Sequence, residues 1–496
     1  MPSPTVVLLP MWAPGHFSSM LEACKRLLQC SRRSAGGGTE AFSLTVLVMP
    51  PPMDSITTAL TSSEASSSQL TSGDDVGIIF HHLPAVEHPT DRSVYPSDYI
   101  RLFAPHVKEA IAGLAAPVAA VVFDFFATTL LDVVHDLALP AYVYFTSTGA
   151  TLAFMLRSPA IYDKEFAARL QEKQGTVDLP GMPPVPVTSM PSPEQNDYAW
   201  FVYYGRRFME ARGIIVNTAT ELEPGVLASL AVPGGDRGGA PPVYPIGPVL
   251  SQKPPRSGSA TDRSPAPPPH ECVRWLDGQR PASVVFLCFG SMGWMDARQA
   301  REVATGLERS GHSFLWVLRG PPPAAGASLY PTPTDADLGD LLPDGFLERT
   351  KWTGLVWPSW APQSEILAHA SVGGFVTHCG WNSVLESLWH GVPMAPWPMY
   401  AEQPLNAFEL VACMGVAVEL GVRDSFFVEA AELERAVRGL MGGSEEGRKA
   451  REKAMAMMAA CRKAVEEGGS SYAAVQEVVQ DILRSYGSSR DGDSTE

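Results

Sequence analysis

Short apolar runs alternate with amphipathic segments along the N-terminal part of the chain. The runs that predict buried strands are residues 5–10, 42–49, 119–123 and 141–145. Residues 128–137 lie between the last two runs, and their apolar positions have helical spacing. Repeated strand–helix units predict an α/β fold, in which a parallel sheet is covered by helices on both faces.

The alternation stops at residues 232–270, which are rich in Pro, Gly and Ser, a composition typical of linkers and surface loops. It restarts with apolar runs at residues 283–289, 314–318 and 374–377. We therefore predict two domains. The segments are an N-terminal domain of residues 1–250, a linker of residues 251–270, a C-terminal domain of residues 271–465 and a disordered tail of residues 488–496.

Two pairs of residues have the spacing of capping boxes and predict where helices begin. Ser19 and Glu22 form the first pair, which would place His16 just ahead of a helix. Ser383 and Glu386 form the second pair, which would start a helix at Asn382 or Ser383.

Composition narrows the class of protein. With 496 residues the chain is too long for one core, since single cores stop growing near ~250–300 residues. Its net charge of -16 counts against nucleic acid or an anionic membrane as a partner. The seven cysteines include no CxxC pair, which counts against a disulfide framework or a zinc site. The N-terminus has no basic leader, and the uncharged run at residues 137–156 is interrupted by Pro140, so we expect a cytosolic protein without a membrane span.

Candidate chemistry follows the predicted strands. Ligands of open α/β sheets bind beyond the carboxyl ends of the strands. The polar or glycine-containing turns at these ends contain His16, Asp124, Thr146, Ser291 and the segment 378–383. In parallel sheets these turns would share one rim, with groups from both halves of the chain.

His16 and Asp124 allow two interpretations. A carboxylate that orients a histidine and stabilises its imidazolium form makes that histidine a general base. Alternatively, His16 is an ordinary loop histidine and Asp124 is a helix N-cap. Spacing alone leaves both interpretations open.

Residues 378–383 combine a strand end, Gly380 and a helix start. Free N–H groups and the helix dipole favour an anion there, and His378 could add a donor to a phosphate. The alternative is a plain strand–turn–helix junction closed by a capping box. The chain has no GxGxxG after the first strand, no GxxxxGK[ST] loop, no HExxH and no Asp-rich cluster, which counts against a dinucleotide dehydrogenase, a P-loop NTPase and a metalloenzyme.

Residues 360–403 read WAPQSEILAHASVGGFVTHCGWNSVLESLWHGVPMAPWPMYAEQ. This stretch resembles the signature box of plant family-1 UDP-sugar glycosyltransferases. Further matches, such as PGH at 14–16, FDFF at 123–126 and EEGGSSYAAV at 466–475, extend the resemblance over almost the whole chain. It implies a GT-B fold of two facing Rossmann-like domains with an interdomain cleft. It also implies that the final helix, residues 466–487, packs back on the N-terminal domain.

The resemblance implies a role for each matching residue. Trp360 would stack on uracil, and Ala361, Gln363 and Glu386 would contact the base and ribose. The diphosphate would be held by Ser291, His378, Asn382 and Ser383. The sugar would contact Thr146, Trp381, Glu402 and Gln403. His16 and Asp124 match the catalytic pair of the family.

The implied reaction is inverting transfer of a hexose, giving a β-O-glycoside. The UDP-sugar is a co-substrate, and neither a cofactor nor a metal is expected. Ser19 replaces a common proline and resembles a flavonoid-active branch, whereas Glu402 replaces the more common aspartate. Gln403 and Trp381 resemble glucose-using members. We therefore expect transfer of glucose to an anthocyanidin or other flavonoid. UDP-galactose as donor is one alternative, and a non-catalytic UDP-sugar-binding protein is another.

The acceptor would lie in an apolar pocket of the N-terminal domain. Candidates to line the pocket are Phe17, Phe125, Trp200 and Tyr203, each of which could equally be ordinary core. Apart from the donor and a small phenolic acceptor, we expect no nucleic-acid partner and a monomeric state. A cytosolic location leaves peripheral association with the endoplasmic reticulum open.

Overall fold

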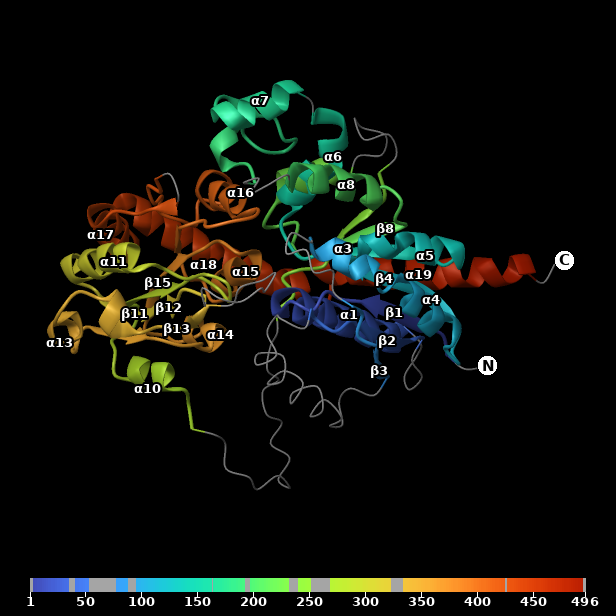
Figure 1. Ribbon diagram of the computed structural model, residues 1–496, viewed down its shortest axis with the longest axis horizontal. Helices are drawn as coiled ribbons and strands as arrows, with labels where there is room; N and C mark the ends of the chain where they lie inside the picture. The colour runs from blue at the N-terminus through green and yellow to red at the C-terminus, as the bar shows by residue number, and fades with distance from the viewer. Residues whose placement is uncertain are drawn as a thin grey trace.

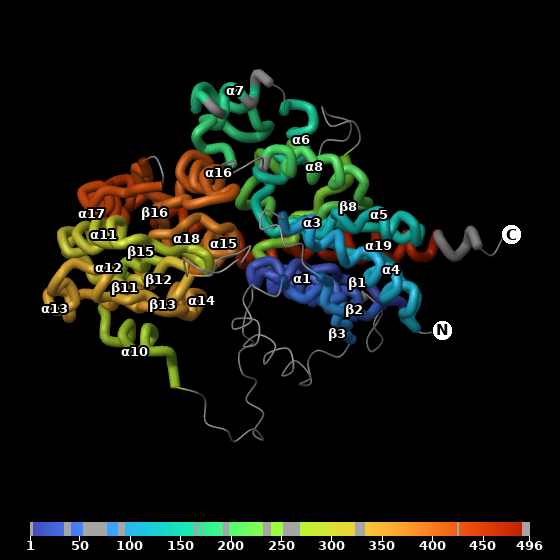
Figure 2. The backbone as a smooth tube through the Cα atoms, in the orientation of Figure 1, coloured from blue at the N-terminus to red at the C-terminus, as the bar shows by residue number. Residues whose placement is uncertain are grey.

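The computed structural model describes residues 3–34, 41–52, 77–87, 95–162, 164–191, 197–231, 240–250, 268–322, 333–423 and 426–493. Two α/β units lie side by side in Figure 1, one blue to green and the other yellow to orange. The red C-terminal helix runs along the first unit (Figure 2). Residues 251–267 of the predicted linker lie outside the described residues, and the domain boundaries stay a prediction.

The first unit contains a seven-stranded parallel sheet in the order β3-β2-β1-β4-β5-β8-β9. Its strands are β1 (Thr5–Leu9), β2 (Ser43–Val48), β3 (Ile78–His82), β4 (Val118–Asp124), β5 (Ala141–Phe145), β8 (Gly213–Val216) and β9 (Val243–Pro245). The four strands predicted in this half are confirmed to within a residue at each end. The sequence pattern misses β3, which ends in two histidines, and the short β8 and β9, which have 4 and 3 residues.

Helices and turns connect these strands. They are α1 (Pro14–Ser34), α3 (Pro96–Arg101), α4 (Ala104–Ala112), the 3₁₀ helix η1 (Phe125–Leu130), α5 (Leu131–Asp136), α6 (Gly149–Ile161), α7 (Lys164–Glu172), the 3₁₀ helix η2 (Val187–Ser189), α8 (Asp197–Phe208) and α9 (Pro224–Ala231), with a small antiparallel pair of β6 (Thr176–Val177) and β7 (Val185–Pro186). The helix expected over residues 128–137 begins earlier, as η1, because Asp124 caps it.

The second unit contains a five-stranded parallel sheet in the order β14-β11-β10-β15-β16. Its strands are β10 (Val284–Cys288), β11 (Ser313–Val317), β14 (Gly354–Trp357), β15 (Val372–Thr377) and β16 (Met394–Pro396), beside an antiparallel pair of β12 (Arg319–Gly320) and β13 (Thr334–Asp335). The remaining elements are α10 (Glu271–Asp277), α11 (Ala297–Ser310), α12 (Leu338–Leu341), α13 (Phe346–Thr350), α14 (Gln363–Leu367), α15 (Trp381–Trp389), α16 (Gln403–Phe408), the π-helices η3 (Glu409–Cys413) and η5 (Gly439–Gly443), α17 (Ala430–Arg438), α18 (Glu445–Val465) and α19 (Ser470–Asp493). The three strands predicted in this half are confirmed, as is the α/β class.

Apolar contacts join the two units. Ala219 and Leu222, which follow β8, belong to the core of the second sheet. Leu405 of α16 belongs in turn to a core cluster of the first unit. Val478 and Ile482 of α19 are fully buried against α1 and the first sheet, so the last helix of the chain packs on the N-terminal unit. These buried contacts from each unit to the core of the other hold the two units together.

Two predicted ends differ in the structure. Helix α1 begins at Pro14, a residue suited to the first turn because its missing N–H would be unpaired there anyway. His16 therefore lies within the first turn of the helix, not ahead of it. The last helix continues to Asp493, so residues 488–493 of the expected disordered tail are helical, and residues 494–496 lie outside the described residues. No proline interrupts this polar segment, and the Ser488 hydroxyl donates to the Arg484 carbonyl at 3.0 Å.

Candidate active site

The carboxyl ends of both sheets carry the polar turns that the sequence predicts. His16 lies just after β1, Asp124 ends β4, and Thr146 directly follows β5. On the second sheet, Ser291 lies just after β10 and His378 directly follows β15. Because the strands of each sheet are parallel, each set of turns lies at one edge of its sheet.

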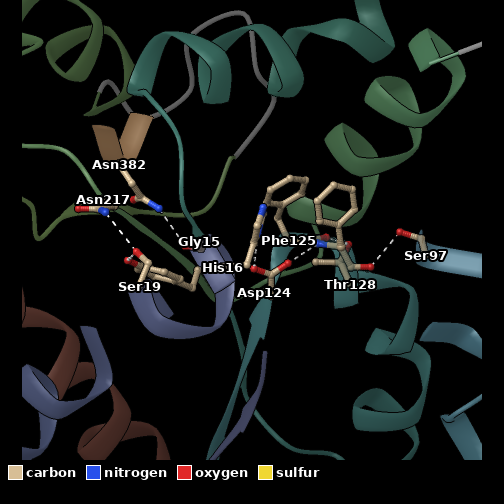
Figure 3. Close-up of polar contacts among 11 residues, drawn as sticks. Gly15, His16, Ser19, Ser97, Asp124, Phe125, Thr128, Asn217 and Asn382 are labelled. Carbon is tan, nitrogen blue, oxygen red and sulfur yellow. Dashed lines mark hydrogen bonds and ion pairs between the residues drawn. The ribbon is translucent and has the colours of Figure 1, made fainter. Parts of the chain in front are cut away.

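Direct hydrogen bonds join the two edges. The side-chain amide of Asn382 donates to the Gly15 carbonyl at 2.9 Å (Figure 3). The Ser147 hydroxyl donates to Oε1 of Glu402 at 3.1 Å. Gly15, next to the predicted base, and Ser147, next to Thr146, thus touch predicted donor-binding residues of the other unit.

His16 and Asp124 form a hydrogen-bonded pair, with 2.8 Å between Nδ1 and Oδ2 (Figure 3). The carboxylate is fully buried, whereas the imidazole keeps 23% of its surface exposed. The other carboxylate oxygen accepts from the Phe126 N–H at 3.0 Å. Asp124 is therefore both the N-cap of η1 and the partner of His16, so the two interpretations of this residue hold together.

This geometry determines the state of the imidazole ring. A carboxylate can only accept, so Nδ1 carries the proton and Nε2 keeps its lone pair. Burial alone lowers the pKa of His16, but the charge of Asp124, the hydrogen bond to it and the charge of Glu402 raise the pKa above its ordinary 6.5. A partly exposed imidazole with a free Nε2 and a strengthened basicity can act as a general base.

The start of α15 offers an anion site. The N-cap residue Gly380 makes no side-chain cap bond, and helix α15 begins at Trp381. The expected capping box does not form, because the N-cap is Gly380 and Ser383 lies inside the first turn, where its hydroxyl accepts from Nε2 of Gln363 at 2.9 Å. Free N–H groups and the positive end of the helix dipole are left at this terminus.

His378 lies beside this helix start in a tight backbone environment. A Cβ added at Gly290 or at Gly380 would come within 2.5 Å of its Nε2. Its Nδ1 is buried without a hydrogen-bond partner, and so is Oδ1 of Asn382. Burial lowers the pKa of His378 to about 4, so the ring is neutral at physiological pH and can donate without carrying charge. Unpartnered polar atoms at a helix N-terminus fit a phosphate ligand.

The predicted nucleoside residues lie together beyond β14. Trp360 exposes 66% of its surface, which leaves its ring available for stacking, while Ala361 is buried. Nε2 of Gln363 also donates to Oε2 of Glu386 at 2.8 Å. Burial raises the pKa of Glu386. The structure thus brings Gln363, Ser383 and Glu386 into one cluster.

The residues expected at the sugar have partners within the protein. Oε1 of Gln403 accepts the backbone N–H groups of Met399 and Tyr400 at 2.8 and 3.1 Å. The indole N–H of Trp381 donates to the Asn217 carbonyl at 2.6 Å and is therefore already used. Thr146 is buried at the end of β5, next to Ser147 and its bond to Glu402.

An aromatic cluster extends away from His16. The Phe125 and Phe126 rings lie 5.4 and 5.3 Å from the imidazole centroid. Its members are Tyr95, Phe125, Phe126, Trp200, Tyr203 and Tyr204, with Tyr95 and Trp200 stacked at 4.4 Å. Three acceptor candidates belong to this cluster, but Phe17 packs against the core shared by α1 and α19.

Sequence reasoning missed Tyr95, Phe126 and Tyr204. Tyr204 could have been found, because Trp200 and Tyr204 are four residues apart on one face of a helix.

Among the described residues, Asp132, His135 and Glu210 form an exposed group whose spacing would allow a metal ion. Arg207 already forms ion pairs with both carboxylates of this group. Within the same described part of the chain, no helix has the length and apolar character needed to cross a membrane.

Comparison with known proteins identifies the family and the fold of the chain. Residues 259–457 match the family described as UDP-glucoronosyl and UDP-glucosyl transferase. The chain is 54% identical to malvidin galactosylase UGT88C3 of Oryza sativa subsp. japonica, covering 98% of both chains. It is 39% identical to the anthocyanidin 5,3-O-glucosyltransferase of a Rosa hybrid cultivar, over 96% of this chain and 98% of that one. The crystal structure of a ugt transferase from Siraitia grosvenorii in complex with UDP superimposes with a TM-score of 0.80 at 36% identity, covering 97% of this chain and 99% of that chain.

Proposed function

The chain belongs to the plant family-1 UDP-glycosyltransferases, and we propose that it transfers a hexose from a UDP-sugar to a hydroxyl of a flavonoid-type acceptor such as an anthocyanidin. The observation that carries the proposal is the hydrogen-bonded pair of His16 and Asp124, with 2.8 Å between Nδ1 and Oδ2. The bond from Asn382 to the Gly15 carbonyl joins the start of α15 to the residue next to His16. A base and an anion site on facing units are what such a transfer needs.

The reaction follows from this geometry. Nε2 of His16 takes the proton of the acceptor hydroxyl while that oxygen bonds to the anomeric carbon. The bond from this carbon to the UDP oxygen breaks, and UDP leaves with the electron pair. The N–H groups of α15 and the His378 ring stabilise the charge that develops on the diphosphate. Attack opposite the leaving group converts an α-linked donor into a β-O-glycoside, and Asp124 stabilises the imidazolium that forms.

The donor lies along the second unit in this proposal. Trp360 stacks on uracil, and the ribose is bound by Glu386, which Gln363 holds in place at 2.8 Å. Ser291, Asn382 and Ser383 contact the diphosphate together with His378. Glu402, Gln403 and Thr146 contact the sugar. Trp381 uses its indole N–H on Asn217, so a hydrogen bond that it donates to the UDP-sugar would come from its backbone N–H.

Galactose is the donor sugar that the comparisons favour. Residues such as Gln403 favour glucose from sequence, yet the relative that is 54% identical is named a galactosylase. The relative named a glucosyltransferase is 39% identical. We therefore put UDP-galactose ahead of UDP-glucose. The aromatic cluster beside His16 supports a flat phenolic acceptor, because stacked and edge-on ring contacts suit such molecules.

A donor and acceptor panel tests the proposal. Purified protein is incubated with UDP-galactose, UDP-glucose and other UDP-sugars and a mixed phenolic library that includes malvidin, and products are identified by mass spectrometry. We expect a hexosylated anthocyanidin or flavonoid, formed fastest from UDP-galactose. Turnover with UDP-glucose alone would overturn the donor assignment. Absence of product from every donor would favour the non-catalytic alternative, against which the intact His16–Asp124 pair argues.

A further inference from the structure

Asn217 is a fully buried amide at the end of β8. Its Oδ1 accepts the Val249 N–H at 2.7 Å, and its Nδ2 donates to the Val249 carbonyl at 3.3 Å. The same nitrogen donates to the Ser19 hydroxyl at 3.2 Å (Figure 3). Both amide protons and the amide oxygen are therefore used, which holds the side chain in one orientation.

Two paths lead from the first turn of α15 to the start of α1. The direct path is the bond from Asn382 to the Gly15 carbonyl. The indirect path runs from the Trp381 indole N–H to the Asn217 carbonyl at 2.6 Å, and from the Asn217 amide to Ser19. Gly15 and Ser19 lie on either side of His16 in α1. Trp381 and Asn382, the first two residues of α15, are thus connected to Ser19 and Gly15, which flank His16 in the first turns of α1.

Ser19 is in turn fixed to the sheet. Its hydroxyl lies 2.7 Å from the Tyr144 hydroxyl, on β5. Ser19 is buried, and burial raises the pKa of Tyr144, which keeps the phenol neutral. A residue without a side-chain hydroxyl at this position would break the network between Asn217 and Tyr144.

We propose that Asn217 and Ser19 are positioning residues that link the diphosphate site at α15 to the placement of His16. This inference rests on the proposed role of His16 as the base. Neither residue needs to touch a substrate. Their contribution is to keep Nε2 of His16 at the attack distance once the donor occupies α15, and a displacement of about 1 Å at a reacting group can cost roughly 100-fold in rate.

A double-mutant cycle of Ser19→Ala and Trp381→Phe tests the indirect path. Ser18→Ala is the matched control, because Ser18 is an exposed serine in the same helix. We expect each single variant to lower kcat roughly 10-fold, with KM for the UDP-sugar and Kd for UDP within about 2-fold of wild type. The double variant should lose about as much as one single variant, because both changes break one path. Ser18→Ala should match wild type.

Hydrogen exchange gives a readout that does not depend on transfer. UDP should protect the first two turns of α1 in wild type and in Ser18→Ala, and this protection should fall by about half or more in Ser19→Ala. Unchanged kcat and protection in Ser19→Ala, or losses that multiply in the double variant, would overturn the inference. If wild type forms no product but shows the expected protection, the proposed function fails while the link between α15 and α1 stands. If product forms without that protection, the link fails alone.

Discussion

Nδ1 of His16 lies 2.8 Å from Oδ2 of Asp124, although 108 residues separate them in the chain. Their strands, β1 and β4, are neighbours in the first sheet, and Leu9 pairs with Phe123 at the ends that lead to the two residues. Asp124 is also fixed from the other side, because it accepts the Phe126 N–H. The carboxylate therefore orients the imidazole from a position that the backbone sets.

Asp124→Asn should lower kcat by roughly 100-fold or more, because the amide no longer stabilises an imidazolium. The acid limb of the pH–rate profile should move to lower pH. Burial of His16 still lowers its pKa in this variant, whereas the charge and hydrogen bond of Asp124, which raise the pKa, are gone. The measurement is kcat/KM between pH 5 and 9. An acid limb at the wild-type position would contradict the pairing.

Gly290→Ala should weaken UDP binding roughly tenfold or more, the equivalent of losing a good hydrogen bond. The added Cβ would lie 2.5 Å from Nε2 of His378 and would displace the ring. Gly311→Ala separates this clash from backbone strain. Gly311 has a φ of +73°, close to the +74° of Gly290, but open space around its Cβ position. Calorimetric titration of UDP checks both variants, and equal losses would attribute the effect to strain.

Trp360→Ala should weaken UDP binding by ~1–3 kcal/mol, because stacking on the base is lost. Trp352 provides the control. It is 82% exposed and precedes β14, whereas Trp360 follows the other end of that strand. Trp352→Ala should leave the affinity unchanged. Equal affinities of the Trp360 variant and wild type for UDP would remove Trp360 from the donor site.

Glu409→Gln should make stability less dependent on pH. Glu409 is buried against Glu223, whose oxygens already accept the Gly149 and Ala150 N–H groups at 2.9 Å and the Thr218 hydroxyl. Burial first, and then the Glu223 charge, raise the pKa of Glu409 well above 4.5. The protonated form is thus favoured in the folded state, and its stabilising effect is lost as pH rises from about 4.5 through that raised pKa.

The uncharged glutamine has no such loss, so the Glu409 variant should exceed wild type at pH 9 by roughly 1–3 kcal/mol. Thermal unfolding from pH 5 to 9 measures the difference in the free energy of unfolding. Glu348→Gln, at an 82% exposed side chain, is the control and should follow wild type. Parallel curves for the Glu409 variant and wild type would contradict the raised pKa of Glu409.

Local pattern predicts the strands of this chain better than its helix ends. Residues 141–145 form β5 as expected, because a run buried on both faces must be apolar throughout. Ser19 and Ser383 both have capping-box spacing, yet neither caps a helix. Their hydroxyls bond to Tyr144 and Gln363, which are distant in sequence. Contacts between residues that are distant in sequence cannot be inferred from a pattern of four neighbouring residues.

The candidate active site, too, could be predicted only in part from the sequence. His16 and Asp124 could be suggested from strand ends, but their contact depends on the order of strands in the sheet, which the sequence pattern does not contain. Phe17 adjoins His16 in the chain, yet successive helical residues point about 100° apart, so Phe17 turns toward the core shared with α19. The roles of Trp381 and Asn217 also escape sequence reasoning, because their bond crosses from one unit to the other.

The central claim is that His16 removes the acceptor proton while the second unit binds the donor. The most direct measurement is sugar transfer and UDP affinity in His16→Ala, with His135→Ala, an exposed histidine on α5, as the control. We predict that His16→Ala lowers kcat by roughly 100- to 10,000-fold and keeps the UDP Kd of wild type. The control variant His135→Ala should be as active as wild type. Undiminished turnover in His16→Ala would contradict the account.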